Sequence, residues 1–380
     1  MIRAETFVDE TRRHGFALWS GVPCSYLKPF INYVIDDPTL TYMGAANEGD
    51  AVAIASGADL GGKRAVVMFQ NSGFGNTVNP VTSLNMIFKV PVLIITTLRG
   101  EPGGPHDEPQ HELMGEITPG LFDLMQVPWA WFPTEESEVA AVLARAVAHM
   151  DAHRTPFGLI MKKDSVSDHK LKTRAEPRSI APFEVKPWSK AAALPSRRDV
   201  LAALQASASP TDAFIATTGF TGRALYALDD RPSQLYMVGS MGCASTFGLG
   251  LAWAQPQRKV IVLDGDGAAL MRLGAFATLG YERPTNLVHV LLDNEVHDST
   301  GGQSTVSHSV DLAGVAAACG YPKVVRAHTA AEVARLAAEA TELTFIHVKT
   351  APGESKDLPR PKETPVQVID RMRAWLKETA

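Results

Sequence analysis

The chain has 380 residues, of which 45% are hydrophobic and 20% charged, so it supports a packed core and excludes wholesale disorder. Its 36 Lys and Arg residues against 41 Asp and Glu residues give a net charge of −5, which leaves no basic surplus for binding nucleic acid. The longest apolar stretch, residues 90–98, is about half as long as a membrane span needs. With a charged N-terminus unlike a signal peptide and three widely spaced cysteines, we expect a cytoplasmic protein with no nucleic-acid or membrane partner.

Short apolar runs alternate with helical patterns in the first half of the chain. The runs predict strands at residues 16–19, 40–42, 65–69, 90–96 and 157–161. Between them, helices are predicted at residues 26–35, 48–60, 78–88 and 136–150. Because the strands lack polar alternation, they are typical of a parallel sheet that is covered on both faces.

A charged segment with four prolines, residues 166–195, interrupts this pattern and predicts a linker. After it, strands are predicted at residues 213–216, 234–238, 259–263, 286–292 and 344–348. Helices are predicted at residues 198–207, 244–254, 268–279, 312–319, 330–340 and 364–377. The expected fold is therefore α/β, with two doubly wound parallel-sheet domains at residues 1–165 and 196–380.

The most informative turn follows the predicted strand 259–263. It reads Asp-Gly-Asp-Gly, with Asp266 between two glycines that let a ligand approach the backbone. The next strand ends in Asp293-Asn294, and side chains at the ends of neighbouring parallel strands lie close together. A carboxylate beside a diphosphate needs a divalent cation between them, and oxygen ligands favour Mg²⁺. The alternative reading is an ordinary turn between a strand and a helix.

This Gly-Asp-Gly turn, followed by Asp293-Asn294, resembles the signature of thiamine diphosphate enzymes, with Asp293 in place of the first asparagine. The resemblance implies that Asp266, Asn294 and the backbone carbonyl of Val296 hold Mg²⁺ on the cofactor. It also implies that Met241 is an apolar wedge that bends the cofactor. The full set of cofactor contacts that it implies in this half is Thr218, Gly219, Gly239, Ser240, Met241, Gly265, Asp266, Gly267, Ala268, Asn294, Val296 and His297.

The resemblance implies that residues 1–165 form the pyrimidine-binding domain and residues 196–380 the diphosphate-binding domain. Glu48, which follows the predicted strand 40–42, matches the catalytic glutamate of these enzymes. Asn71, Ser72 and Gly73 are the further cofactor contacts implied in this half. The alternative reading of Glu48 is structural, since Asn47 is a good N-cap and an acid in the first helical turn complements the helix dipole.

Longer strings resemble the phosphonopyruvate decarboxylase family, whose close relatives are the sulfopyruvate decarboxylases. They are GVPCSYLKPFINYVI (21–35), QNSGFGNTVNPVTSL (70–84), ITTLRGEPG (95–103), DEPQHELMG (107–115), LDNEVHDSTGGQ (292–303) and LPRPKETP (358–365). This resemblance implies decarboxylation of phosphonopyruvate to phosphonoacetaldehyde with thiamine diphosphate and Mg²⁺. It also implies a homodimer or homotetramer whose active sites lie between subunits.

An anionic substrate requires cationic and hydrogen-bonding groups. The resemblance implies Glu48, His111 and His297 as catalytic residues, with Ser25, Arg99, Asp298, Ser299 and Thr300 toward the substrate. The structural alternatives are that Arg99 is a solvated loop residue and that His297 only orients the metal loop. Two other functions stay open at this point, a sulfopyruvate decarboxylase and a thiamine diphosphate-fold subunit without catalysis.

Overall fold

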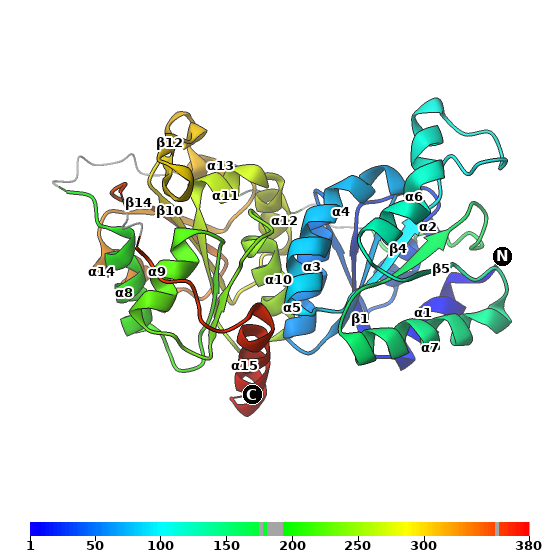
Figure 1. Cartoon of the computed structure of the whole chain (residues 1–380), viewed down its shortest axis with the longest axis horizontal. Helices are drawn as coiled ribbons and strands as arrows, with labels where there is room; N and C mark the ends of the chain where they lie inside the picture. Colours follow the sequence, from blue (N-terminus) through cyan, green and yellow to red (C-terminus); the bar gives the residue numbers. More distant parts are fainter. Residues whose placement is uncertain (175–177, 179, 181–192, 354–356, 380) are drawn as a thin grey trace. The chain divides into compact units, whose positions relative to one another are not determined.

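The computed structural model describes residues 1–174, 178, 180, 193–353 and 357–379. The chain divides into two compact units, Met1–Pro177 and Arg178–Ala380 (Figure 1). The division falls within the segment predicted as a linker, residues 166–195, much of which lies outside the described residues. Each unit is described by itself below.

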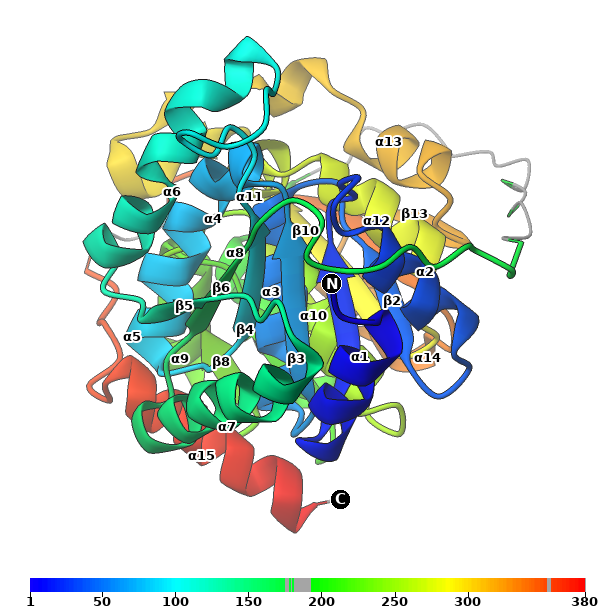
Figure 2. The same ribbon diagram turned by 90° about the vertical axis from the view of Figure 1, so that its right-hand side faces the viewer.

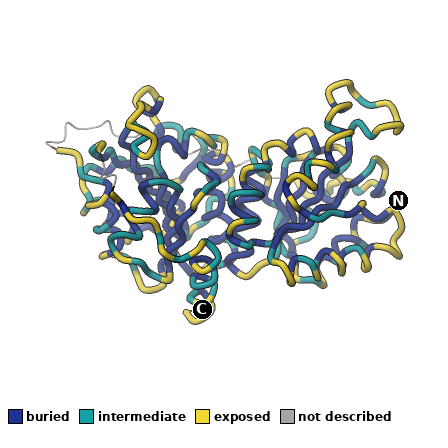
Figure 3. The backbone as a smooth tube through the Cα atoms, in the orientation of Figure 1, coloured by how far each residue is buried: buried dark blue, intermediate teal, exposed yellow. Residues whose placement is uncertain are grey.

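The first unit contains a six-stranded parallel sheet in the order β2-β1-β3-β4-β6-β5. Its strands are β1 (Phe16–Gly21), β2 (Thr41–Gly44), β3 (Arg64–Phe69), β4 (Leu93–Thr97), β5 (Trp129–Trp131) and β6 (Phe157–Met161). The central strands β3, β4 and β6 are almost wholly buried (Figure 3), as their uninterrupted apolar sequences require.

Helices cover both faces of this sheet. They are α1 (Ala4–Arg13), α2 (Lys28–Asp36), α3 (Glu48–Leu60), α4 (Phe74–Pro80), α5 (Met86–Phe88), α6 (Glu112–Leu124) and α7 (Glu136–His153), with short turns η1 (Asn71–Gly73), η2 (Val81–Asn85) and η3 (Pro109–His111). One hydrophobic cluster joins α1, α2 and α7 to the sheet, around Phe7, Phe30 and Trp19. Helix α3 packs on β1 and β3 from the opposite side (Figures 1 and 2).

The helix predicted at residues 78–88 is instead α4, the wider turn η2 and α5 in succession. Pro80 is the last residue of α4, and because proline lacks a backbone N–H it removes one hydrogen bond of a regular helix at this point. The sequence analysis did not predict α1, α6 or the three-residue strand β5. Strand β5 lies between Pro128 and Pro133, which break the apolar run around it and make this stretch resemble a loop.

The second unit repeats the architecture with a six-stranded parallel sheet in the order β13-β14-β10-β9-β7-β8. Its strands are β7 (Ala213–Ala216), β8 (Gln234–Tyr236), β9 (Val260–Gly265), β10 (Leu287–Asp293), β13 (Lys323–Ala327) and β14 (Thr344–Lys349), besides a small antiparallel pair, β11 (Val296–His297) and β12 (Gln303–Ser304). Its helices are α8 (Arg197–Ser207), α9 (Phe220–Leu228), α10 (Ala244–Ala254), α11 (Asp266–Met271), α12 (Gly274–Glu282), α13 (Leu312–Ala318), α14 (Ala330–Glu339) and α15 (Pro365–Glu378), with short turns η4 (Asp298–Thr300) and η5 (Val306–Ser309).

Here α8 and α14 pack against each other on one side of the sheet, while α10 and α12 lie on the other (Figure 1). The prediction of one helix over residues 268–279 is wrong, because the chain leaves the helical conformation at Arg272 and begins again in α12. The strand β13 and the helix α9 were not predicted. None of the described helices is long and apolar enough to cross a membrane. The predicted fold class, two doubly wound parallel sheets, is confirmed.

Candidate functional site

The carboxyl ends of β9 and β10 form the centre of a hollow in the second unit. These strands are neighbours, with Gly265 paired to Leu292, so Asp266 and Asn294 follow adjacent strand ends. The predicted residues that line the hollow are Thr218, Gly219, Met241, Gly265, Asp266, Gly267, Ala268, Asn294, Val296, His297, Asp298 and Ser299. Gly239, Ser240 and Thr300 are not among its lining residues.

Asp266 is buried at the start of α11. Its Oδ2 accepts hydrogen bonds from Thr305 Oγ1 and from Ser307 Oγ, the latter at 3.0 Å. Burial raises the pKa of Asp266 above its ordinary value, and the nearby Asp293 carboxylate adds to this effect, although the hydroxyl of Thr305 opposes it. A cation bound to Asp266 would reverse this shift, because it favours the ionised carboxylate.

Asn294 lies at the tip of β10, followed by Glu295 in the left-handed region at φ 61°. Its Oδ1 accepts a hydrogen bond from Val296 N at 3.3 Å, and its Nδ2 donates to Asp298 Oδ2 at 2.6 Å. The buried Arg197 also binds Asp298 Oδ2, at 3.0 Å. The Asp298 carboxylate, which the sequence analysis placed toward the substrate, is therefore engaged by two neighbours of the same unit.

Three residues that line the hollow carry oxygen atoms of the kind that a hard divalent cation binds. They are the Asp266 carboxylate, the Asn294 amide oxygen and the Val296 carbonyl, a set that suits Mg²⁺ when phosphate oxygens and water complete the shell. Within the described ranges there is no cluster of three or more His, Cys, Asp or Glu residues that could hold a metal.

Glycine at position 267 permits a close approach on one side of the hollow. A Cβ added there would lie 2.7 Å from His297 Cε1 and 3.4 Å from Met241 Cε. The segment before α10 presents Met241 through two left-handed residues, Ser240 at φ 52° and Gly242 at φ 92°. Such a conformation is costly for a serine and points to a local functional requirement.

The first unit places Glu48 at the start of α3, where Asn47 caps the helix by accepting a hydrogen bond from Gly49 N at 2.9 Å. Asn76 Nδ2 donates to Glu48 Oε2 at 2.8 Å. A Cβ at Gly73 would lie only 2.0 Å from Glu48 Oε1. The Glu48 carboxylate therefore occupies the space that the side chain of any residue other than glycine at position 73 would need. Asn76 was missed by the sequence analysis, although it lies inside the QNSGFGNT string on which the resemblance rests.

Asn71 and Arg99 join two loops at the carboxyl ends of β3 and β4. The buried Asn71 donates from Nδ2 to the Arg99 carbonyl at 2.9 Å and accepts from Arg99 N at 3.2 Å. The Arg99 guanidinium forms a two-point ion pair with Asp107, with 2.6 Å between Nε and Oδ2. The charge of Arg99 is thus balanced within the unit. Ser72 Oγ accepts a hydrogen bond from Gln70 at 2.7 Å.

His111 and Ser25, the remaining predicted residues of this unit, differ in accessibility. His111 is buried, and its Nδ1 has no hydrogen-bond partner among the residues that the structure describes. A buried, unsatisfied ring nitrogen calls for an explanation, and a ligand is one. Ser25 is exposed and lines a separate surface pocket with Tyr26 and Lys163.

Two models of known families match the chain. The N-terminal TPP binding domain of thiamine pyrophosphate enzymes matches residues 1–118, and the C-terminal TPP binding domain of the same enzymes matches residues 218–348. The chain is 44% identical to a phosphonopyruvate decarboxylase of Streptomyces viridochromogenes, over 99% of this chain and 95% of the relative. It is 42% identical to a phosphonopyruvate decarboxylase of Streptomyces hygroscopicus, over 100% and 95% of the two chains.

A sulfopyruvate decarboxylase of Methanosarcina acetivorans is 27% identical over 98% of this chain and 97% of the relative. Among solved structures, the thiamine diphosphate-dependent 4-hydroxybenzoylformate decarboxylase of Rhodococcus jostii RHA1 superposes with a TM-score of 0.71 at 14% identity. That comparison covers 93% of this chain and all of the other, and it shows the shared fold.

Proposed function

We propose that this chain, which belongs to the phosphonopyruvate decarboxylase family of thiamine pyrophosphate enzymes, decarboxylates 3-phosphonopyruvate. In this proposal Mg²⁺ serves as a cofactor together with thiamine diphosphate. The enzyme is a thiamine diphosphate-dependent decarboxylase, and hence a carboxy-lyase. In the proposed reaction the bond between the carboxylate and the keto carbon breaks, CO₂ leaves, and a proton takes its place. The products are CO₂ and phosphonoacetaldehyde.

The observation that carries the proposal is the hollow in the second unit, where Asp266, Asn294 and Val296 converge from two adjacent strand ends. These three residues would hold Mg²⁺ and, through it, the diphosphate. When bound, thiamine diphosphate supplies the electron sink that a 2-oxo acid lacks once CO₂ has left. Met241, on the wall of the same hollow, would support the cofactor through apolar contact.

Glu48 would hold a ring nitrogen of the cofactor's pyrimidine through its carboxylate, whose position is set by Asn76 and by the open space at Gly73. His111 and His297 are the proposed proton donors to the carbon that loses CO₂. His111 suits this role because its Nδ1 is buried and, among the described residues, has no partner. His297 suits it because it lies against Gly267 at the hollow.

Ser25, Ser299 and Thr300 are proposed to hydrogen-bond the anionic substrate, and all three are exposed. Arg99 and Asp298 would act differently from a pair of free charges. Arg99 is paired with Asp107, so it would donate hydrogen bonds to the substrate without adding a net charge. The Asp298 carboxylate only accepts hydrogen bonds, so it would act near the substrate by holding Arg197 and Asn294 in place. We further propose that the active protein is a homodimer or homotetramer with active sites between subunits.

The proposed substrate is tested by measuring aldehyde release from phosphonopyruvate, sulfopyruvate and pyruvate in parallel, with thiamine diphosphate and Mg²⁺. We expect phosphonopyruvate to be strongly preferred, and we expect activity to be lost with EDTA and restored by added Mg²⁺. Preference for sulfopyruvate would overturn the substrate and leave the cofactors. Full activity in EDTA, after dialysis against the chelator, would overturn the metal.

Replacing Gly73 by alanine is expected to lower turnover by about 10²-fold, the loss that a displacement of about 1 Å causes in an active site. The added Cβ would overlap Glu48 Oε1, so the carboxylate must move. Gly75 provides a matched control two residues away, because a Cβ there meets nothing within 4 Å. Steady-state kinetics on both variants measure the effect. Equal turnover of Gly73→Ala and Gly75→Ala would contradict the proposed contact between Glu48 and the cofactor's pyrimidine.

A further inference from the structure

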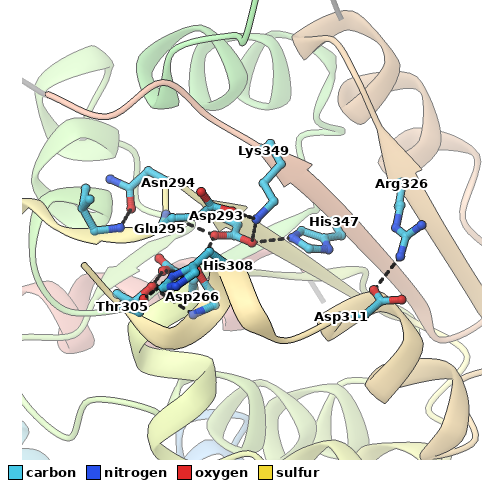
Figure 4. A network of polar contacts seen from close by, with 12 residues as sticks. Asp266, Asp293, Asn294, Glu295, Thr305, His308, Asp311, Arg326, His347 and Lys349 are labelled. Atoms are coloured by element: carbon cyan, nitrogen blue, oxygen red, sulfur yellow. Dashed lines mark hydrogen bonds and ion pairs between the residues drawn. The ribbon is translucent and has the colours of Figure 1, made fainter. Parts of the chain in front are cut away.

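A network of polar side chains that surrounds a buried carboxylate lies beside the proposed metal ligands (Figure 4). Its centre is Asp293, the last residue of β10, which is wholly buried. Parallel pairing puts Asp293 opposite Lys349 and Leu291 opposite His347 on β14. Because residues two apart in a strand share a face, His347 and Lys349 both lie on the side of β14 that Asp293 faces.

The contacts of Asp293 are short and come from two cationic or ionisable groups. His347 Nε2 and Lys349 Nζ each lie 2.7 Å from Asp293 Oδ2. Burying a carboxylate costs several kcal/mol unless charge and hydrogen bonds compensate it. Burial raises the pKa of Asp293, but the hydrogen bonds from His347 and Lys349 outweigh burial and lower it to about 2.

Lys349 makes a second contact that gives it a special place in the network. Its Nζ also donates to Glu295 Oε1 at 2.5 Å, so one ammonium group binds the residues on both sides of Asn294. Glu295 has the left-handed backbone described above, which is strained for a glutamate. That turn carries Asn294 before it and Val296 after it.

The other carboxylate oxygen of Asp293 connects the network to Asp266, another of the proposed metal ligands. Ser307 Oγ lies 3.0 Å from Asp293 Oδ1 and 3.0 Å from Asp266 Oδ2, and it bridges the two carboxylates. Asp266, Asp293 and Glu295 therefore form an acidic cluster around the turn, and Lys349 is bound directly to two of its three carboxylates. Removing the ammonium would leave Asp293 buried with one partner fewer and release the strained turn.

We propose that Lys349 is a positioning residue that fixes the turn Asn294–Val296 for Mg²⁺ and the diphosphate by bridging Asp293 and Glu295. The inference rests on the proposed function, because it deepens the metal site described there. In the contacts above, Lys349 binds Asp293 and Glu295 and none of the three proposed metal ligands. It therefore acts through the two residues that flank Asn294. Its effect should therefore appear in metal and cofactor binding.

The test is the Mg²⁺ concentration at which the protein retains half of its thiamine diphosphate in equilibrium dialysis. Lys349→Met is expected to raise this concentration about 10–100-fold, the usual cost of losing a partner that orients metal ligands. Adding Asp293→Asn to that variant removes the buried charge that Lys349 balances, and we expect it to recover most of the lost affinity. Lys323→Met, at the opposite end of neighbouring strand β13, is the matched control and should bind as the unchanged protein does.

Glu295→Gln keeps the buried pair and weakens only the second contact of Lys349, so it remains informative if Lys349→Met does not fold. It should shift the Mg²⁺ requirement in the same direction by a smaller factor. Unchanged Mg²⁺ dependence in both Lys349→Met and Glu295→Gln would overturn the inference alone, as would failure of Asp293→Asn to recover any affinity. If the unchanged protein bound thiamine diphosphate equally well with and without Mg²⁺, the proposed metal site would be overturned, and this role of Lys349 with it.

Discussion

Replacing Glu48 by glutamine is expected to lower turnover of phosphonopyruvate by about 10²–10⁴-fold, the range that a positioned acid or base contributes. Glutamine has nearly the same size and keeps an oxygen that can accept the hydrogen bond from Asn76. The variant should therefore fold, and it should lose only the negative charge that favours the reactive protonation state of the cofactor. Turnover is measured by aldehyde release at saturating thiamine diphosphate and Mg²⁺.

The matched control for this variant is Glu5→Gln, which neutralises an exposed acid of the same unit on α1. Its turnover should equal that of the unchanged enzyme. If Glu48→Gln bound the cofactor and turned over as fast as this control, Glu48 would be only the acid that complements the dipole of α3. The kinetic comparison therefore separates the catalytic reading of Glu48 from the structural one.

The second large effect is expected for Asp266→Ala, which should weaken Mg²⁺-dependent binding of thiamine diphosphate by more than about 100-fold, beyond the 10–100-fold typical of outer-shell partners. The substitution removes the only carboxylate of the proposed ligand set and leaves the hydroxyls of Thr305 and Ser307 without their shared acceptor. Equilibrium dialysis with and without Mg²⁺ measures the change, and turnover should fall with cofactor occupancy.

Thermal unfolding provides an independent measurement of the same loss. A ligand that binds only the folded state raises the melting temperature, so Mg²⁺ with thiamine diphosphate should stabilise the unchanged protein and not Asp266→Ala. Asp229→Asn, a change at an exposed acid that pairs with Arg231, should keep the full stabilisation. Equal stabilisation of Asp266→Ala and the unchanged protein would place the metal elsewhere.

Local sequence patterns predicted most of the buried framework. The strands at residues 157–161 and 213–216 and the helices at residues 48–60 and 244–254 match the structure at both ends. These segments are rich in apolar residues and almost wholly buried, which makes the pattern strong. The missed strand β13 is half-buried at a sheet edge, where side chains need not be apolar, and its sequence carries two charges.

Side-chain partners in the candidate site were predicted much less well than the elements that carry them. The turn at Asp266 and the strand end at Asn294 could be found from sequence, because glycine, aspartate and asparagine at strand ends form a local pattern. Their supporting contacts could not. Thr305 and Ser307 reach Asp266 from about forty residues away, and Asn76 reaches Glu48 across 28 residues, so no spacing rule indicates either contact.

The amino-acid sequence by itself determined the fold class of this enzyme and the strand ends at which its chemistry is expected, because hydrophobic periodicity and turn residues act over short distances along the chain. Its family was indicated by the resemblance of longer strings, such as residues 70–84 and 292–303. Only the tertiary structure decided which charges face one another. Strand register brings Lys349 opposite Asp293, and loop packing pairs Arg99 with Asp107. Such pairings depend on how crossovers and loops bring distant segments together, and the cost of burying a charge then selects the partners that remain.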